Sequence, residues 1–323
     1  KYLDIQPYRR FDSPLQIQTK RGCPLKCSYC TYNRIEGHHY RLRKPEFVAK
    51  EIEDLVSVTG IKHIEFTDST FNIPLEHSKA VLRAISKSGL KLRLHTMGVN
   101  PGAVDEELID LMKEVGFTDV DLGAESGSAV TLKNLAKNFT KEDILRAAKL
   151  LQDRKISIQW FLLVGAPAET RETLQETFDT ISRAALKWDL IDISVGLRVY
   201  NGSPAAEWLR RKNPNCTNDN FLHPAHVEPS NINLNTIKRL TKHASFRYPN
   251  FFMHDEDENI PAVLTIIGVK LLRLFGLRKP VWIWFILLRR LETVFGIRRL
   301  KLFFFEFRFK GNNNPCGYED IAE

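Results

Sequence analysis

Short apolar runs alternate with longer amphipathic stretches through residues 15–200, and this alternation limits the fold more than any other feature. Short runs of near-continuous hydrophobicity are typical of strands that are buried on both faces. We expect six strands, at residues 15–19, 61–67, 90–96, 117–123, 156–164 and 190–195. Helices are expected at residues 45–58, 75–88, 104–115 and 169–187, and in stretches leading to residue 154. A strand, a helix and a second strand in succession form a parallel crossover, so the predicted class is α/β with a parallel sheet.

Such a sheet can be doubly wound or can curve into a barrel. A barrel builds its active site from the loops after all its strands, whereas a doubly wound sheet uses only its switch point. Residues that could carry chemistry follow each predicted strand, at positions 23–30, 67–69, 95–96, 125–126, 165–167 and 198. We therefore predict a partial (β/α)6 TIM-like barrel over residues 1–204, with a helical C-terminal extension over residues 205–323.

Three cysteines on one short loop form the densest chemical motif of the chain. Cys23, Cys27 and Cys30 have the spacing C-x3-C-x2-C, while Cys216 and Cys316 lie far downstream. Thiolates select zinc, Cu(I) or iron–sulfur clusters over hard cations. Three of them on one loop can hold a metal centre and leave one coordination position open for a ligand.

Three states of this loop are compatible with the sequence. A structural zinc site needs a fourth ligand, which His38 or His39 could supply, and the chain would then be a non-enzymatic interaction protein. Buried cysteines without a metal would not need this spacing. An iron–sulfur cluster with one free iron uses three thiolates and explains the missing fourth cysteine.

The motif, with Tyr29 before its last cysteine and at the end of the first strand of a β/α barrel, resembles that of the radical SAM superfamily. The resemblance covers roughly residues 10–205. It implies that Cys23, Cys27 and Cys30 are catalytic and hold a [4Fe–4S] cluster, whose fourth iron binds S-adenosylmethionine (SAM). In that family an electron cleaves the sulfonium C–S bond, and the 5′-deoxyadenosyl radical abstracts a substrate hydrogen. An electron donor such as flavodoxin or ferredoxin is therefore an expected partner.

The resemblance also implies cofactor contacts after the second and fourth strands. Asp68 stands where the family contacts the methionine amine, although the usual sequence there is Gly-Gly-Glu. Glu125 matches the family's ribose-contact position, and its neighbour Ser126 is also expected to bind the cofactor. A carboxylate can accept hydrogen bonds from both ribose hydroxyls. The alternative for Glu125 is a solvated loop acid.

Further cofactor contacts are expected after the fifth and sixth strands. Gly165 and Pro167 resemble the family's glycine turn near the adenine, where glycine permits close backbone approach. A simple strand-to-helix turn is the alternative. The Tyr29 backbone is expected near the adenine. Arg198 could hold the SAM carboxylate or a substrate anion, or could pair with an acid.

The runs at residues 21–43, 66–72 and 197–204 look like the catalytic half of cobalamin-binding (class B) radical SAM proteins. Many of those are methyltransferases that act on unreactive carbon or phosphorus. They carry a cobalamin-binding domain ahead of the barrel, whereas fourteen residues precede the first predicted strand here. Cobalamin is therefore expected only if its domain was removed or lies on another chain. Epimerisation, dehydrogenation and carbon–carbon bond formation remain alternatives to methylation, while methylthiolation is not expected.

The basic charge of the chain is concentrated near its C-terminus. The net charge is +8, and residues 268–310 hold eleven Lys or Arg against two acids. The apolar runs at 262–269 and 280–288 are shorter than the ~20 residues that span a bilayer. We expect residues 261–310 to contact an anionic membrane peripherally, with access to an apolar, lipid-like or natural-product substrate. The alternative is a helical cap on the barrel.

Two further expectations concern partners and location. No nucleic-acid recognition motif accompanies the basic charge, so no nucleic acid is expected as a partner. The chain opens with Lys1-Tyr2-Leu3-Asp4 and shows no apolar signal-peptide region. We therefore expect a cytoplasmic location, where the loop cysteines would be metal-bound rather than paired in disulfides.

Overall fold

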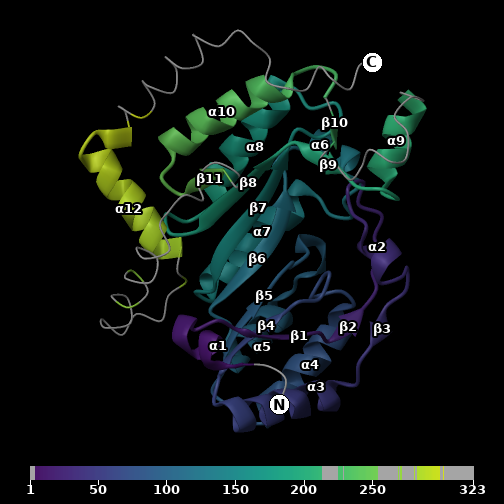
Figure 1. Ribbon diagram of the computed structural model, residues 1–323, viewed down its shortest axis with the longest axis vertical. Coiled ribbons are helices and arrows are strands. Elements are labelled where there is room, and N and C mark those ends of the chain that lie inside the picture. The colour runs from purple at the N-terminus through teal and green to yellow at the C-terminus, as the bar shows by residue number, and fades with distance from the viewer. Residues whose placement is uncertain are drawn as a thin grey trace.

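The structure, a computed structural model, describes residues 4–212, 225–227, 229–253 and 282–298, and positions 268, 270, 280 and 301. The predicted membrane segment at 261–310 is therefore described only in part, and Cys216 and Cys316 lie outside the described residues. Figure 1 shows a sheet that runs through the molecule with helices along it.

Parallel strands in chain order form the framework. One group is β1 (Leu15–Ile17), β4 (His63–Phe66) and β5 (Arg93–Thr96), and every pairing in it is parallel. The other is β6 (Asp119–Glu125), β7 (Ser157–Val164), β8 (Leu190–Val195) and β11 (Phe251–Met253), also parallel. Bridges from Leu94 to Phe117 and from Val99 to Leu122 join the groups between β5 and β6. Each of the six predicted strands is confirmed, as is the partial TIM-like barrel.

The strand β11 was not predicted. It pairs in parallel with β8, with Phe252 opposite Asp192, although it comes from beyond residue 204. Its three side chains are all buried. The sheet therefore extends past the predicted boundary between the barrel and the C-terminal region. The sequence did not indicate β11, because a three-residue strand is too short to show a periodic pattern.

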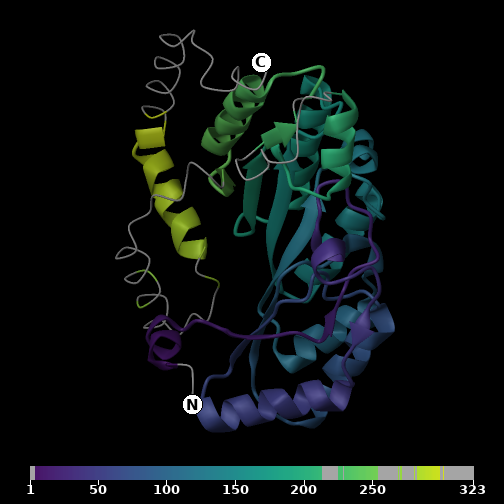
Figure 2. The same ribbon diagram turned by 45° about the vertical axis from the view of Figure 1, so that its right-hand side comes forward.

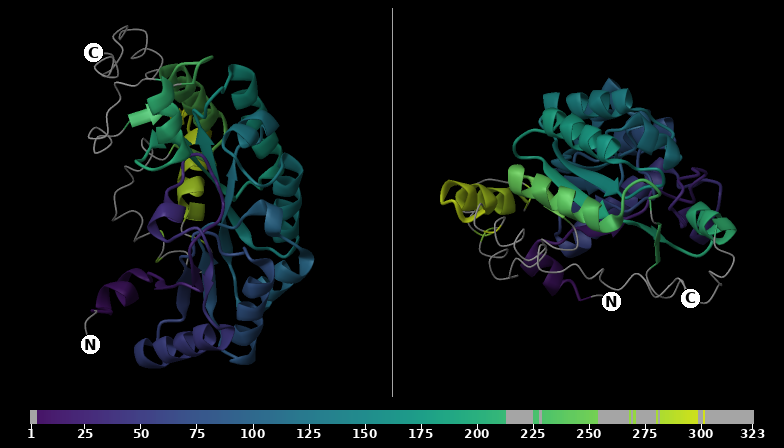
Figure 3. Two further views of the ribbon diagram at one scale, coloured as in Figure 1. Left: turned by 90° about the vertical axis from the view of Figure 1, so that its right-hand side faces the viewer. Right: turned by 90° about the horizontal axis from the view of Figure 1, so that it is seen from above.

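Helices cover one face of this sheet (Figure 3). They are α3 (Pro45–Thr59), α4 (Leu75–Lys87), α5 (Glu106–Val115), α7 (Lys141–Asp153), α8 (Arg171–Ala184) and α10 (Leu234–Arg247). Local signals set several of their ends. Thr140 and Asp143 form a capping box at the start of α7, and Gly116 ends α5 in the left-handed conformation. The remaining elements are α1 (Gln6–Phe11), β2 (Lys20–Arg21), α2 (Tyr32–Ile35), β3 (Arg41–Leu42), η1 (Pro101–Ala103), α6 (Ala129–Asn134), β9 (Leu197–Val199), α9 (Pro204–Lys212), β10 (Ala225–Val227) and α12 (Trp282–Val294).

The two faces of the sheet differ in polarity. Between sheet and helices, the rings of Phe66, Phe71 and Phe117 pack with centroids 5.0 to 6.0 Å apart. The opposite face of β5 and β6 holds an ionic group, in which His95 Nδ1 lies 2.6 Å from an Asp119 oxygen and Nε2 lies 3.5 Å from Asp121. Burial opposes the charged imidazole, but the bonds to Asp119 and Asp121 outweigh it and raise the pKa of His95 to about 10. His95 is therefore an imidazolium at neutral pH.

The helix α12 lies beside α10 and the sheet edge (Figure 2). Trp282 and Ile286 are buried against Phe252 of β11, and the Trp282 indole N–H donates to the carbonyl of Trp188 at 3.2 Å. In the described part of the chain, no helix is both long enough and apolar enough to cross a membrane.

Candidate functional site

The cysteine loop lies between β2 and α2 and is held by backbone contacts. Cys23 and Cys27 are buried, whereas Cys30 is partly exposed. The Cys23 N–H donates to the Gly37 carbonyl at 3.0 Å. Gly22 has φ +88°, and a Cβ there would lie 2.1 Å from the carbonyl oxygen of His39. Only glycine can therefore occupy the position before Cys23 without moving the loop.

The loop is also tied to distant parts of the chain. The Ser28 N–H donates to the Leu135 carbonyl at 3.0 Å, and the Ser28 carbonyl accepts from the Ala205 N–H at 2.8 Å. These bonds place the cysteines between the segment after α6 and the start of α9. Burial raises the pKa of the Cys27 and Cys30 thiols, as expected for buried thiols without a metal.

A cavity of about 110 Å³ opens beside the cysteines. It is lined by the three cysteines, Leu25, Tyr29, Tyr32, Asn33, Ser69, Thr70, Gly98, Val99, Asn100, Gly123, Glu125, Lys137 and Phe139. The lining comes from the cysteine loop, from the segments that follow β4 and β5, and from the end of β6. The carboxyl ends of neighbouring parallel strands thus meet at one place, as the barrel predicts.

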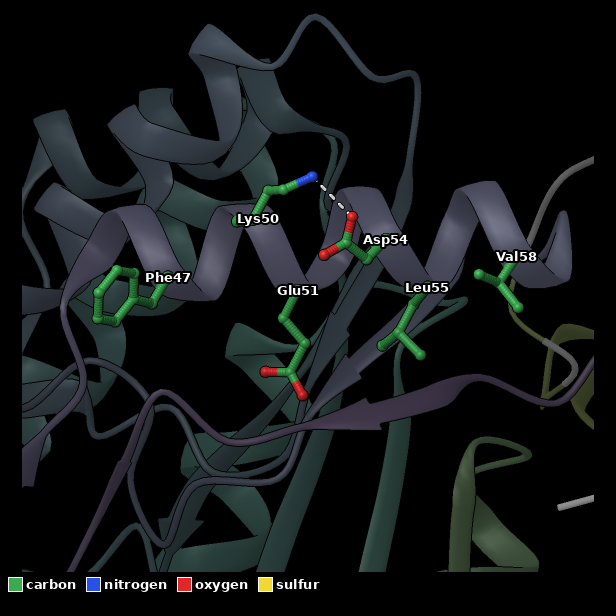
Figure 4. Close-up of a pocket in the computed structure, with 6 residues that line it drawn as sticks. All are labelled: Phe47, Lys50, Glu51, Asp54, Leu55 and Val58. Carbon is green, nitrogen blue, oxygen red and sulfur yellow. Dashed lines mark hydrogen bonds and ion pairs between the residues drawn. The ribbon is translucent and has the colours of Figure 1, made fainter. Parts of the chain in front are cut away.

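A larger hollow of about 450 Å³ lies elsewhere, along the outer side of α3. Figure 4 shows its six lining residues, which all belong to that helix, and the 2.7 Å ion pair between Lys50 and Asp54. A solvent-exposed pair of this kind contributes little energy. None of the predicted site residues lines this hollow, so the smaller cavity is the candidate site.

Tyr29, Glu125 and Lys137 form a compact polar group in the cavity wall. The Tyr29 hydroxyl donates to Glu125 Oε1 at 2.6 Å. Lys137 Nζ lies 3.1 Å from the same carboxylate oxygen and 3.1 Å from the Tyr29 hydroxyl oxygen. It also lies 5.4 Å from the centre of the Tyr29 ring. One carboxylate oxygen therefore accepts from a phenol and from an ammonium.

Electrostatics stabilise the ammonium form of Lys137. Burial opposes the charged ammonium, but the carboxylate of Glu125 and the sulfur of Cys27 outweigh it and raise the pKa of Lys137. Burial, followed by the charge of Glu125, raises the pKa of Tyr29 well above its usual range. The cavity therefore presents a neutral phenol and an ammonium at neutral pH, both next to the side chain of Glu125.

Glu125 reaches the cavity through an irregular backbone. Its φ is +61°, a left-handed value that is costly for a residue with a side chain, by about 1–3 kcal/mol. The register of β6 against β7 shifts between Leu122 and Glu125. Such bulges re-aim side chains next to functional sites. The end of β6 is thus bent so that the carboxylate meets Tyr29 and Lys137.

Lys137 is a site residue that the sequence analysis missed. It lies in the turn between α6 and α7, twelve positions after Glu125, where no helical or strand period marks it. Its side chain is only 8% exposed. A basic residue in the loop that follows a strand-end carboxylate is the one sequence signal that could have indicated it.

Asp68 is close to the cavity but turns away from it. Its carboxylate accepts from the Thr19 N–H at 2.8 Å and the Thr19 hydroxyl at 2.7 Å, and lies 3.4 Å from Lys20 Nζ. The side chains of both Asp68 and Lys20 are fully buried. The predicted contact of Asp68 with the methionine amine therefore has no support in this geometry. Its neighbours Ser69 and Thr70 line the cavity instead.

The structure gives Ser126 and Gly165 packing roles. The Ser126 hydroxyl lies 2.7 Å from that of Thr177 on α8, in a fully buried contact. Gly165 has φ +93°, and because it lacks a side chain its backbone can lie close to that of Gly196. Neither residue lines the cysteine cavity, so their predicted cofactor contacts stay predictions.

Pro167 and Arg198 also lie outside that cavity. The Pro167 carbonyl accepts from the Asn134 side chain at 3.0 Å. Arg198 is exposed on β9, and its guanidinium lies 5.0 Å from the centre of the Tyr200 ring. The structure thus brings together the three cysteines, Tyr29 and Glu125 out of the predicted residues, and their roles with a cofactor remain predictions.

A family profile described as "Radical SAM superfamily" matches residues 17–181, which is just over half of the chain. The chain belongs to the radical SAM superfamily. Membership implies a [4Fe–4S] cluster and SAM, and the three thiols on one loop fit such a cluster. Among the described residues, no three His, Cys, Asp or Glu side chains converge so as to hold a single metal ion. A cluster does not need that convergence, because each thiolate binds a different iron.

Named relatives of the chain differ in reaction. The chain is 31% identical to tryptophan 2-C-methyltransferase of Streptomyces laurentii over 198 residues, which cover 57% of this chain and 32% of the relative. It is 32% identical to the anaerobic magnesium-protoporphyrin IX monomethyl ester cyclase of Rubrivivax gelatinosus over 183 residues, or 55% and 32% of the two chains. The chain spans about a third of the length of the curated relatives it matches.

A solved structure shows the same fold. The radical SAM methyltransferase TsrM from Kitasatospora setae, with cobalamin and a [4Fe–4S] cluster bound, superposes with a TM-score of 0.61 and 27% identity. The match covers 71% of this chain and 46% of that one. The partial barrel is therefore the radical SAM fold, and the chain is an enzyme of this superfamily.

Proposed function

We propose that this enzyme cleaves SAM reductively on a [4Fe–4S] cluster held by Cys23, Cys27 and Cys30. The radical formed would functionalise an unactivated C–H bond. The observation that carries the proposal is the cavity in which these cysteines meet an opposed charge pair, Glu125 and Lys137, 3.1 Å apart. An alternative reading of the loop as a zinc site in a non-enzymatic protein has no comparable support.

The charge pair suits a zwitterionic ligand. When bound, the cluster supplies the electron that breaks the sulfonium C–S bond of SAM. Lys137 can donate to a carboxylate, and Glu125 can accept from an ammonium or from ribose hydroxyls. Tyr29 holds the Glu125 carboxylate in place through its 2.6 Å hydrogen bond. Because the two charges satisfy each other before a ligand arrives, the ligand need not meet an unpaired buried charge.

Methylation is the reaction we favour, with cobalamin as a methyl carrier. TsrM is a methyltransferase that binds cobalamin, and a second relative is a tryptophan 2-C-methyltransferase. Because one relative is a cyclase, a radical transformation other than methylation is the second candidate reaction. A flavodoxin or ferredoxin would donate the electron. The substrate would be an apolar natural product or lipid-like molecule.

The cluster is tested by anaerobic reconstitution of the full chain. We expect about four iron per chain, and 5′-deoxyadenosine on reduction in the presence of SAM. Cys27→Ala should lose both iron and product, whereas Cys316→Ala, outside the loop, should retain them as the matched control. Stoichiometric zinc without 5′-deoxyadenosine would overturn the proposal.

The choice between reactions needs a separate measurement. Hydroxocobalamin added to the reconstituted protein should co-elute with it in gel filtration and change its absorbance spectrum. If all the cobalamin elutes free, this chain does not bind cobalamin by itself, and methyl transfer through cobalamin would require a cobalamin-binding domain outside residues 1–323. The cluster and SAM cleavage would still stand, because the first experiment tests them independently.

A further inference from the structure

Several contacts among the described residues anchor the helix α12. Arg289 donates to the Phe251 carbonyl, and its guanidinium lies 3.7 Å from the centre of the Phe252 ring. Arg290 donates to the Lys187 carbonyl at 2.9 Å. Together with buried Trp282 and Ile286, these contacts fix the helix against the sheet edge. The orientation of its other residues is therefore set by packing.

The far end of α12 exposes apolar side chains. Leu291 is 45% exposed, Val294 78%, Phe295 74% and Ile297 43%. We call these four residues the α12 tip. Gly296, with φ +73°, makes the turn between Phe295 and Ile297. Single exposed apolar residues need no explanation, but four within seven positions form a patch of the kind that contacts a partner or a membrane.

A basic pocket of about 420 Å³ adjoins the α12 tip. Its basic lining residues are Arg171 on α8, His243 and Arg247 on α10, and Arg298. Among the described residues that line it, none is an Asp or a Glu. The remaining lining residues are Leu174, Gln175, Phe178, Leu240, Ala244, Phe246, Tyr248 and Thr293. The pocket therefore combines positive charge with an apolar and aromatic wall.

Arg298 joins the two features. Its guanidinium donates to the carbonyls of Ser245 and of Phe246 at the end of α10, the latter at 3.3 Å. It thereby holds the α12 tip against α10, which also lines the basic pocket. Thr293 and Arg298 line the pocket and are neighbours of tip residues in the chain. One flat partner could therefore contact the tip and the pocket at the same time.

We propose that the α12 tip and the basic pocket dock this enzyme on an anionic phospholipid bilayer. The tip enters the boundary between headgroups and acyl chains, and a lipid phosphate lies in the pocket. Charge complementarity favours a membrane, because residues 268–310 carry eleven Lys or Arg against two acids. Apolar side chains flanked by cations are what an interfacial segment needs, whereas a free phosphate would use only the pocket.

Flotation of the reconstituted full chain with lipid vesicles tests the proposal. We expect recovery with vesicles that contain phosphatidylglycerol at least about tenfold higher than with pure phosphatidylcholine vesicles, and a loss of recovery at high salt. Absence of flotation with both vesicles would overturn the proposal. Equal flotation with both would also overturn it, since charge would then play no part. Stabilisation by glycerol phosphate without flotation would assign the pocket to a soluble anion and exclude the membrane.

Matched variants locate the surface. Val294→Asp and Arg247→Glu should each lower recovery about tenfold, because one removes apolar contact and the other reverses a charge at the membrane. Val58→Asp, on α3 at the other end of the molecule (Figure 1), introduces the same charge at an equally exposed valine and should bind as the parent does. Unchanged flotation of Val294→Asp, or equal losses for Val294→Asp and Val58→Asp, would show that the α12 tip is not the docking surface.

Discussion

The hydroxyl of Tyr29 donates a 2.6 Å hydrogen bond to the carboxylate of Glu125 across 96 positions of the chain. The bond joins the cysteine loop to the end of β6. Lys137, in the turn after α6, donates to the same Tyr29 hydroxyl. Three segments distant in sequence thus form one cavity wall.

Lys137→Met should lower the affinity for SAM at least about tenfold, because it removes the cation that can pair with the ligand carboxylate. Glu125 would also lose its partner in a position only 13% exposed, so the thermal midpoint should fall. Calorimetric titration with SAM measures the first effect. Lys133→Met, an exposed lysine on the neighbouring helix, is the control and should bind SAM as the parent does. Equal affinities of all three proteins would contradict the assignment of Lys137.

Gly22→Ala should abolish cluster assembly. The added Cβ would meet the His39 carbonyl oxygen at 2.1 Å, in a backbone conformation that disfavours side chains, so the loop that carries Cys23 must shift. Gly60→Ala has a similar φ of +71° with no atom within 4 Å, and should cost only about 1 kcal/mol in stability. Iron content after reconstitution compares the two, and a Gly22→Ala protein with full iron would refute the role of this glycine.

Asp68→Asn should destabilise the fold rather than weaken cofactor binding. Removing one partner of a fully buried ion pair costs about 3–5 kcal/mol, since Lys20 would be left charged without its carboxylate. Urea unfolding measures the loss. Asp54→Asn breaks the exposed pair with Lys50 and should cost less than about 1 kcal/mol. A stable Asp68→Asn protein that binds SAM weakly would instead support the contact predicted from the sequence.

His95 should make stability fall at alkaline pH. Its folded pKa of about 10 lies above the ordinary value of 6.5, so its contribution is complete below about pH 6.5. That contribution is lost as the pH rises through about 10, because the folded state then gives up the proton that binds Asp119 and Asp121. The difference in unfolding free energy between the parent and His95→Asn should shrink steadily from pH 6 to pH 10. A constant difference over this range would show that His95 is not the titrating group.

Much of the fold could be predicted because its signals are local. The six apolar runs indicated the strands, and the predicted helix ranges lie close to those in the structure, where local caps such as Thr140 and Gly116 set the ends. The cysteine spacing indicated a three-thiolate centre without any knowledge of its surroundings. These properties depend on neighbours within a few positions, so the sequence alone determined them.

Contacts between distant segments were decided by the tertiary structure. Asp68 follows a strand just as Glu125 does, yet the first carboxylate is turned to Thr19 and Lys20 and the second to Tyr29 and Lys137. Lys137 and β11 left no periodic trace, because neither lies in a long amphipathic element. Which polar side chain meets the cavity depends on how distant loops pack against one another, and no spacing along the chain encodes that.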